Sequence, residues 1–328
     1  MNGAKRERWL AERKSGLGGS DLGAVLGLSP YRTAVDVWAD KTGRAPPIEP
    51  NLQMRFGSFA EKFVADEYQA RTQHVVQRYN AMLHHPVAPI LGNIDRLVVP
   101  EGKKFAAYRR TIVTDRGMEA KTASAFAASD SEQWGAEGSD QIPPAYLVQC
   151  AAYMALTGCE YWDLAVLFGN QEVRVYNLSR DRELEREIIS RATEWWNAYV
   201  VTDTAPPPVC DSDVRLLFPE DDGRAIEADE RAADLVNHAA ILKREIEERE
   251  IALQGDADSL GILGELKSYM GTASRLVIAD RELATWKTPK DSQVIDWKAV
   301  ALELAPPPEL IAAYTTTKAN SRRFMLKG

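Results

Sequence analysis

Two carboxylates and a lysine in the first half of the chain have the types and order of a metal-assisted hydrolytic site. Asp95 lies in a short apolar run, and a later apolar run ends in Glu119, Ala120 and Lys121. Carboxylate oxygens are the ligands that Mg²⁺ prefers, and a bound ion can polarise a phosphoryl oxygen and activate a water molecule. On a strand, Glu119 and Lys121 point to the same side, so the lysine can orient that water. If the two runs are neighbouring strands, they predict a site for Mg²⁺, or for Mn²⁺ in its place.

The Glu-x-Lys spacing alone is not specific, because the chain contains it elsewhere. Residues 12–14 and 265–267 have the same spacing, but both lie in segments with a helical pattern. Side chains two residues apart on a helix do not face each other, so these segments cannot form the same group. For the strand residues, an exposed and charged strand end stays open as the alternative on spacing alone.

A helix with an aromatic repeat precedes the two strands. The spacing of apolar residues predicts a helix over residues 54–72. Phe56, Phe59 and Phe63 recur on the side expected to face the core. Glu61 lies near the start of this helix, where the helix dipole favours a carboxylate. The local sequence therefore explains Glu61 as a solvated side chain.

Alternating apolar segments predict the strands around the acidic pair. Residues 74–99 alternate as strands, and residues 109–122 form an antiparallel group around a turn at 115–117. Residues 162–179 have the pattern of a β-hairpin. Together these segments predict a sheet that carries the candidate site.

A further helix presents a polar and aromatic face. It begins at Pro144 and ends at Gly158, both of which are favoured at those positions. Tyr146, Gln149 and Tyr153 are spaced to lie on one side of it.

A glycine-rich segment near the N-terminus has two interpretations. Gly18 and Gly19 precede a predicted helix over residues 22–26. Ser20 or Asp21 could cap that helix. Alternatively, the serine and the free backbone N–H groups could hold a phosphate. The local sequence leaves both open.

Composition and cysteine usage exclude several kinds of protein. The three cysteines are widely spaced, so they fit neither a disulfide framework nor a zinc cluster, and a four-cysteine iron–sulfur cluster would lack a ligand. The net charge of −8 does not by itself indicate a nucleic-acid-binding protein. No apolar run has the length of a membrane span, and the N-terminal residues lack a signal-peptide core. We therefore expect a cytoplasmic protein with no membrane partner.

The C-terminal third has a different character from the rest. A break at residues 202–213 predicts a core domain over 1–205 and an extension over 206–328. The extension reads as a charged helical hairpin over 223–270, and then as a strand pair made by 275–288 with 292–300. It ends in a basic tail that contains four cations and no acid, namely Lys318, Arg322, Arg323 and Lys327.

Several modest motifs occur in order over residues 8–180 and are specific in combination. They include W-L-A-E-R, a glycine-rich G-G-S-D-L-G, F-G-S-F-A-E, N-I-D, M-E-A-K and Q-C-A-A-Y, at residues 9–13, 18–23, 56–61, 93–95, 118–121 and 149–153. With these motifs the chain resembles the YqaJ-type viral recombinase nucleases, relatives of phage lambda exonuclease in the PD-(D/E)XK superfamily. The resemblance implies an α/β (α+β) fold, restriction-endonuclease-like, with a mixed central sheet flanked by helices.

The resemblance also implies roles for the acidic residues. Asp95 and Glu119 would hold the catalytic metals, with the carbonyl of Ala120 as a further ligand. Lys121 would position the nucleophilic water. Glu61 would complete the acidic cluster, which differs from the solvated side chain that its local sequence indicates.

Other positions match residues that orient the site or bind DNA in the family. Gln149 would orient the site from its helix, and Tyr153 would pack or contact DNA. Arg13 and Ser20 match positions that grip a 5′-phosphate, which favours phosphate binding over capping for Ser20. In one departure, Arg96 stands where the family usually has a small residue. Its side chain could contact a DNA phosphate or point away from the metal site.

By resemblance, the protein is expected to be a Mg²⁺-dependent double-stranded DNA exonuclease. It would degrade the 5′-ended strand from a duplex end, in the 5′→3′ direction, and leave a 3′ single strand for a single-strand annealing protein. A homo-oligomeric ring is expected, in the cytoplasm of a bacterial host if the gene is carried by a phage. The alternatives are an endonuclease or repair nuclease of the same superfamily, and a non-catalytic DNA-end-binding protein.

Overall fold

The chain forms two compact units in a computed structural model that describes residues 11–45, 49–317 and 322–325. The units are Met1–Leu217 and Phe218–Gly328. The sequence places the boundary earlier, after residue 205. The added segment ends in a helix whose Leu216 and Leu217 pack against a core cluster of the first unit. Lys318 and Lys327 of the expected basic tail lie outside the described residues.

The first unit contains most of the regular structure. Its helices are α2 (Gly19–Val25), α3 (Ala34–Lys41), α4 (Leu52–Thr72), η1 (Ala125–Ser129), α5 (Pro144–Thr157), α6 (Arg182–Trp195), η2 (Trp196–Val201) and α7 (Asp211–Leu217). Its strands are β1 (Val76–Arg78), β2 (Leu83–His84), β3 (Leu91–Gly92), β4 (Arg96–Val98), β5 (Ala107–Tyr108), β6 (Thr111–Ile112), β7 (Arg116–Ala123), β8 (Tyr161–Phe168) and β9 (Glu172–Ser179).

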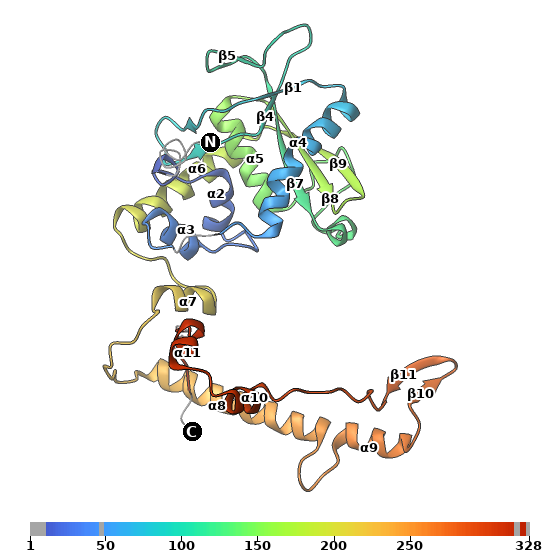
Figure 1. Cartoon of the computed structure of the whole chain (residues 1–328). Helices are drawn as coiled ribbons and strands as arrows, with labels where there is room; N and C mark the ends of the chain where they lie inside the picture. Colours follow the sequence, from blue (N-terminus) through green and yellow to red (C-terminus); the bar gives the residue numbers. More distant parts are fainter. Residues whose placement is uncertain (1–10, 46–48, 318–321, 326–328) are drawn as a thin grey trace. The chain divides into compact units, whose positions relative to one another are not determined.

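Five strands form a mixed central sheet in the order β1-β4-β7-β8-β9 (Figure 1). Strands β7 and β8 run parallel, and the other neighbours are antiparallel. Helices flank this sheet, which confirms the fold class expected from the sequence. Arg96 pairs with Met118 across β4 and β7, so Asp95, one residue earlier, reaches Glu119.

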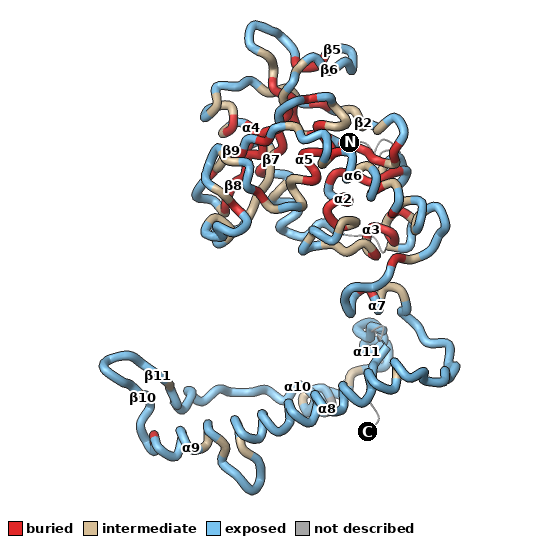
Figure 2. Tube along the Cα trace, turned by 180° about the vertical axis from the view of Figure 1, so that it is seen from behind, coloured by how far each residue is buried: buried red, intermediate tan, exposed pale blue. Residues whose placement is uncertain are grey.

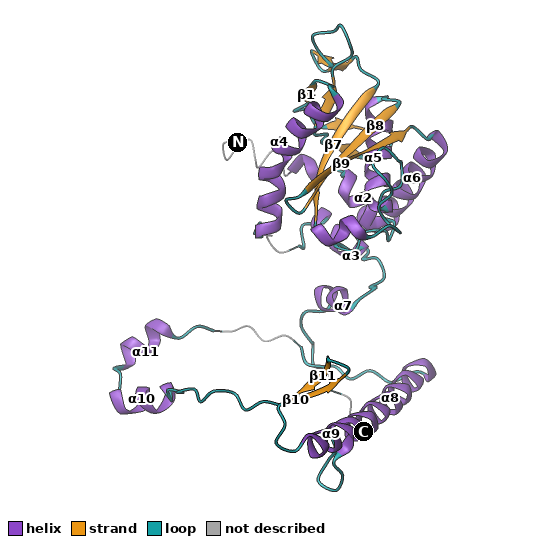
Figure 3. Ribbon diagram, turned by 90° about the vertical axis from the view of Figure 1, so that its right-hand side faces the viewer, coloured by secondary structure: helices purple, strands orange, loops and turns teal. Residues whose placement is uncertain are grey.

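Helices cover both faces of the sheet (Figure 3). On one face α4 packs through Ala60 and Val64 against a cluster that includes Met118. On the other face α5 packs through Cys150 and other residues against the sheet, and α2 and α6 lie beyond α5. Successive side chains of a strand alternate between faces. The alternation along β7 therefore gives one face to the α4 core and the other to the candidate site.

The aromatic repeat of α4 does not face the core. Phe56, Phe59 and Phe63 are exposed, whereas Val64 and Tyr68 are buried. The expectation of an inward aromatic side was therefore wrong. Small and β-branched side chains let a helix lie close to a sheet, and α4 uses Ala60 and Val64 for this contact.

The turn expected at residues 115–117 is also wrong, because β7 already begins at Arg116. Gly117 lies within the strand, where a Cβ atom would come within 2.2 Å of the Trp162 ring. The missing side chain makes room for a buried indole on the neighbouring strand. In this case glycine indicates a close approach rather than a turn.

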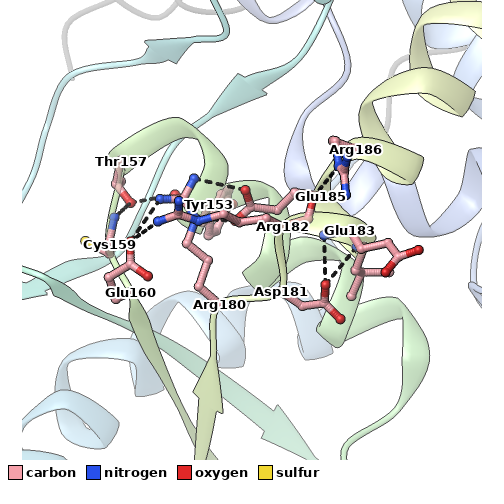
Figure 4. Close-up of polar contacts among 11 residues, drawn as sticks. Tyr153, Thr157, Cys159, Glu160, Arg180, Asp181, Arg182, Glu183, Glu185 and Arg186 are labelled. Carbon is pink, nitrogen blue, oxygen red and sulfur yellow. Dashed lines mark hydrogen bonds and ion pairs between the residues drawn. The ribbon is translucent and has the colours of Figure 1, made fainter.

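A polar network joins the end of β9 to the start of α6 (Figure 4). Arg180 forms two hydrogen bonds with Glu185, of 2.8 and 2.9 Å, and a longer one to Glu160. Asp181 caps α6 by accepting the backbone N–H groups of Glu183 and Leu184. These contacts fix α6 at the position from which it packs on α5.

The second unit has almost no core. Its elements are α8 (Glu230–Gln254), α9 (Gly261–Met270), β10 (Arg275–Ile278), β11 (Arg281–Thr285), α10 (Trp297–Leu304) and α11 (Pro308–Tyr314). Among its described residues Met270 alone is buried, and the tube of this unit is almost entirely pale blue in Figure 2. The two helices of the expected hairpin are present. The strand pair forms within residues 275–285 alone, because the segment expected to be its partner is irregular over 292–296 and helical from Trp297, where α10 begins.

A buried charge cluster centres on Asp21 of α2, whose side chain is fully buried. Lys41 Nζ lies 2.7 Å from Oδ2 of Asp21, and an Arg32 guanidinium nitrogen lies 2.6 Å from Oδ1. The backbone N–H of Gly18 also donates to Oδ2, and Lys41 donates to the carbonyl of Arg13 at 3.0 Å. Burial alone would raise the pKa of Asp21, but Lys41 and Arg32 outweigh it and lower the pKa. The cluster therefore ties α2, α3 and the segment at Arg13 together.

Asp21→Asn is expected to lower the free energy of unfolding by ~3–5 kcal/mol, because it leaves Lys41 buried without its carboxylate. The pKa of Asp21 is lower in the folded state than in the unfolded state. Its stabilisation is therefore present above the unfolded-state pKa of ~3.9, and it is lost as the pH falls through the folded-state pKa. Denaturant unfolding of both proteins over a range of pH measures this difference.

Asp66→Asn is the matched control, since Asp66 forms an exposed ion pair with Lys62 at 2.6 Å on α4. It should remain within ~0.5 kcal/mol of the wild type. Equal losses in the two variants, or a loss in Asp21→Asn that stays constant under strongly acidic conditions, would contradict the prediction.

Candidate functional site

The carboxylate of Glu119 is the centre of the site and is 3% exposed. Its Oε1 accepts a hydrogen bond from Lys121 Nζ at 2.8 Å and one from Gln149 Nε2 at 2.7 Å. Its Oε2 is also buried and has no hydrogen-bond partner. Buried polar atoms are rarely left unpaired. The second oxygen is therefore free to bind a cation or a hydrogen-bond donor.

Burial controls the charges of this group. It raises the pKa of Glu119 to about 8 and also raises the pKa of Asp95. Burial alone would lower the pKa of Lys121, but the neighbouring Glu119 outweighs it and raises the pKa. Lys121 is thus held as an ammonium ion. Beside it, burial makes the charged form of the Glu119 carboxylate costly.

Asp95 lies beside Glu119, as the strand register requires. Its Oδ2 accepts the backbone N–H of Ala120 at 3.0 Å. This hydrogen bond fixes the Asp95 carboxylate against the strand that carries Glu119 and Lys121. The structure therefore brings together the two carboxylates and the lysine that the sequence singles out.

Glu61 lies on α4 and is bound by two arginines. Its Oε1 accepts hydrogen bonds from Arg96 at 2.7 Å and from Arg78 at 2.8 Å. Burial alone would raise the pKa of Glu61, but these two hydrogen bonds outweigh it and lower the pKa. Within the described part of the chain, no three Asp, Glu, His or Cys residues form a group that could hold a metal ion. The structure therefore does not join Glu61 to Asp95 and Glu119 as a ligand set.

The side chain of Arg96 is turned towards α4 and is not a surface group. The residue is 6% exposed, and its guanidinium donates both to Glu61 and to the backbone carbonyl of Asp95, the latter at 2.8 Å. Its neighbour Leu97 packs in the cluster on the α5 face of the sheet. Arg96 therefore occupies the opposite face, as strand alternation requires.

Gln149 and Tyr153 extend the site along α5. Gln149 Nε2 lies 3.1 Å from the Tyr153 hydroxyl, which in turn contacts the carbonyl of Asn93 at 3.4 Å. Tyr153 is 4% exposed. It packs closely under the backbone of Gly19, where a Cβ atom would come within 2.8 Å of its ring. Tyr153 therefore joins the Glu119 group to the glycine-rich segment.

Arg13 and Ser20 line one pocket of about 160 Å³ at that segment. The other lining residues are Gly18, Gly19, Met82, Leu91, Asn93 and Tyr153. Ser20 is exposed and does not cap α2, whose N-cap is Gly18. Asp21 instead accepts the Gly18 N–H. Ser20 is therefore left to line the pocket, although the sequence allowed it a capping role.

Sequence reasoning missed Arg78 and gave no role to Tyr146, although it placed Tyr146 on the same side of its helix as Gln149. Arg78 on β1 is bonded to Glu61, but nothing in its local sequence connects it with a residue on a distant helix. Tyr146 places its ring 5.6 Å from Lys121 Nζ. Its helical spacing with Gln149 was a usable signal, because both face the sheet from α5.

The donor set suits a divalent cation. Asp95 and Glu119 offer carboxylate oxygens, and the unpartnered Oε2 of Glu119 is the observation that favours cation binding here. Mg²⁺ and similar ions prefer such oxygens and keep several waters. The carbonyl of Ala120, between Glu119 and Lys121, is available on the same strand as a further oxygen.

The described residues contain no helix that is both long enough and apolar enough to span a membrane.

Comparisons with known proteins agree with the motifs. A model of the YqaJ-like viral recombinase domain matches residues 8–160. The protein YqaJ of Bacillus subtilis (strain 168) is 31% identical over 331 residues, which covers 98% of this chain and 94% of that protein. The resemblance read from the sequence is thereby confirmed.

Solved structures with similar folds are more distant. An alkaline exonuclease from Laribacter hongkongensis is 19% identical with a TM-score of 0.47, covering 60% of this chain and 93% of its own. A phage-related exonuclease from Haemophilus somnus 129PT is 13% identical with a TM-score of 0.40, covering 58% of this chain and 96% of its own. With the full-length relative and the domain match, the chain belongs to the YqaJ-like viral recombinase family.

Proposed function

We propose that this protein is a divalent-metal-dependent deoxyribonuclease that hydrolyses phosphodiester bonds. The observation that carries the proposal is the buried Glu119 carboxylate, with one oxygen fixed by Lys121 and Gln149 and the other unpartnered. Asp95, which directly precedes the neighbouring strand β4, supplies a second carboxylate. Family membership supports the same conclusion.

Each side chain has a role that follows from its position. Asp95 and Glu119 would hold the metal, together with the carbonyl of Ala120. When bound, a divalent ion would polarise the phosphoryl oxygen and lower the pKa of an attacking water. Lys121 donates a hydrogen bond that positions the water and stabilises negative charge on the phosphate. Gln149 keeps Glu119 in the orientation required for binding.

Within this proposal the metal is Mg²⁺, which Mn²⁺ can replace, and the substrate is the end of a DNA duplex. The enzyme degrades the 5′-ended strand and leaves a 3′ single strand for an annealing partner. Arg13 and Ser20 bind the 5′-phosphate in the pocket that they share. The chains form a homo-oligomeric ring, and they act in the host cytoplasm if the gene belongs to a phage. The motif matches with phage lambda exonuclease relatives support these finer features.

Lys121→Ala and Asp95→Asn are each expected to lower the cleavage rate at least ~100-fold, because each removes a positioned catalytic group. Binding of duplex DNA should be retained. Cleavage of a labelled linear duplex with Mg²⁺, and fluorescence anisotropy for binding, measure the two effects. Lys267→Ala is the control, since it changes the same Glu-x-Lys spacing on helix α9. Unchanged cleavage in both site variants would instead indicate a non-catalytic DNA-end-binding protein.

Linear duplex DNA is expected to be degraded, whereas closed circular DNA of the same sequence should remain intact, because an exonuclease needs an end. Incubation of both forms with Mg²⁺, followed by gel electrophoresis, measures this. The same circle, opened by a restriction enzyme or nicked before the assay, is the control that has the same sequence. Cleavage of the closed circle would favour an endonuclease or repair nuclease.

Wild-type protein is expected to degrade a 5′-phosphorylated duplex at least ~10-fold faster than a 5′-hydroxyl duplex, which is the effect of a hydrogen bond to a charged group. Arg13→Ala should remove that preference. Initial rates on duplexes labelled at either end measure the ratio and also the strand polarity. Arg44→Ala is the control, because Arg44 is an exposed arginine bonded to Asp203. Equal wild-type rates on the two substrates would refute the phosphate pocket.

A further inference from the structure

A buried guanidinium next to the proposed metal ligand distinguishes this site. Arg96 directly follows Asp95 and is 6% exposed. It links two elements, because it donates to Glu61 on α4 and to the carbonyl of Asp95 at the start of β4. Guanidinium groups do not lose their proton in proteins. A permanent positive charge therefore lies beside the backbone of Asp95, on the α4 face of the sheet.

Glu61 is a partner of this charge through its Oε1 atom. The same oxygen of Glu61 accepts from Arg96 and from the more exposed Arg78. If a metal ion took Glu61 from Arg96, the guanidinium would stay buried beside a dication with a weakened counter-charge. Removing one partner of a buried ion pair is strongly unfavourable. Glu61 is consequently a poor metal ligand in this chain.

The formal charges of the site support the same conclusion. Three carboxylates, Asp95, Glu119 and Glu61, meet three cations, Lys121, Arg96 and Arg78. The charges are unevenly divided, because Asp95 and Glu119 lie beside Lys121 alone, whereas Glu61 is bonded to both arginines. The Asp95 and Glu119 group therefore keeps one negative charge for a divalent ion. The Glu61 group carries one positive charge, which disfavours a second ion.

We propose that the site takes one divalent metal ion, held by Asp95 and Glu119, and that the Arg96–Glu61 ion pair stands in the place of a second ion. The proposal rests on the proposed nuclease function and specifies its metal stoichiometry. In this arrangement Arg96 is a positioning residue. It fixes the carbonyl of Asp95, and through the backbone it fixes the carboxylate of that ligand.

Calorimetric titration of the metal-free, full-length protein with Mn²⁺ tests the stoichiometry, and the electron paramagnetic resonance signal of free Mn²⁺ counts the bound ions independently. The wild type is expected to bind one Mn²⁺ per chain. Glu61→Gln keeps the shape of the side chain and should bind one ion with an affinity within ~3-fold of the wild type. Loss of a true ligand or its supporting group weakens metal binding ~10- to ~100-fold.

Arg96→Met tests directly whether the charge of Arg96 stands in the place of a second ion. It frees Glu61 from its buried partner, so a second Mn²⁺ is expected to bind. Arg78→Met is the matched control, because Arg78 bonds to the same oxygen but is more exposed, and it should keep one ion. Thermal unfolding without metal checks that each variant is folded. If Arg96→Met is not folded, the Mn²⁺ binding of the wild type and of Glu61→Gln decides the question.

Two Mn²⁺ ions in the wild type, a loss of ~10-fold or more in Glu61→Gln, or a single ion in folded Arg96→Met would overturn the proposal. Asp95→Asn separates this result from failure of the proposed function. If the wild type binds no Mn²⁺, or if Asp95→Asn binds it as tightly as the wild type, the metal site itself is refuted and the stoichiometry falls with it. One ion in the wild type that is lost in Asp95→Asn supports both.

Discussion

The burial of one carboxylate is the constraint on which the site depends. Glu119 is held between the central sheet and α5, where charge is costly because water is excluded. Lys121 and Gln149 stabilise one oxygen, while the other is left without a partner. A fold selected for stability alone would place an apolar residue at this position. The unsatisfied oxygen therefore indicates a binding function, and the neighbouring elements serve to keep it in place.

Successive residues of β7 alternate between a face that packs in the core and a face that carries the candidate site. Met118 packs on the α4 side of the sheet, whereas Glu119 and Lys121 face α5. Asp95 reaches the same group because β4 runs antiparallel to β7 in the register that pairs Arg96 with Met118. A shift of one residue would exchange the two faces and bury the charged pair in the α4 core. The apolar contacts that fix this register therefore also position the candidate site.

Much of this arrangement could be predicted from the sequence, and the failures have physical causes. The helix from Pro144 to Gly158 and the hairpin of β8 and β9 follow from local signals that tertiary packing reinforces. The aromatic stripe of α4 was assigned to the wrong side, because helical spacing identifies a stripe without saying which neighbour covers it. The ion pair between Arg96 and Glu61 joins residues that are distant in sequence. No local pattern predicts such a contact.

The proposed metal group and the proposed phosphate pocket share one support. Glu119 is bonded to Gln149, Gln149 to Tyr153, and Tyr153 packs under Gly19 in the wall of the pocket. Gln149 and Tyr153 lie one turn apart on α5, so their separation is fixed by the helix backbone. A displacement of this helix would move the pocket and the carboxylate together. In the proposed reaction, the distance between a 5′-phosphate in the pocket and the metal group is therefore set by a rigid element rather than by a loop, which suits the proposed cleavage from a strand end.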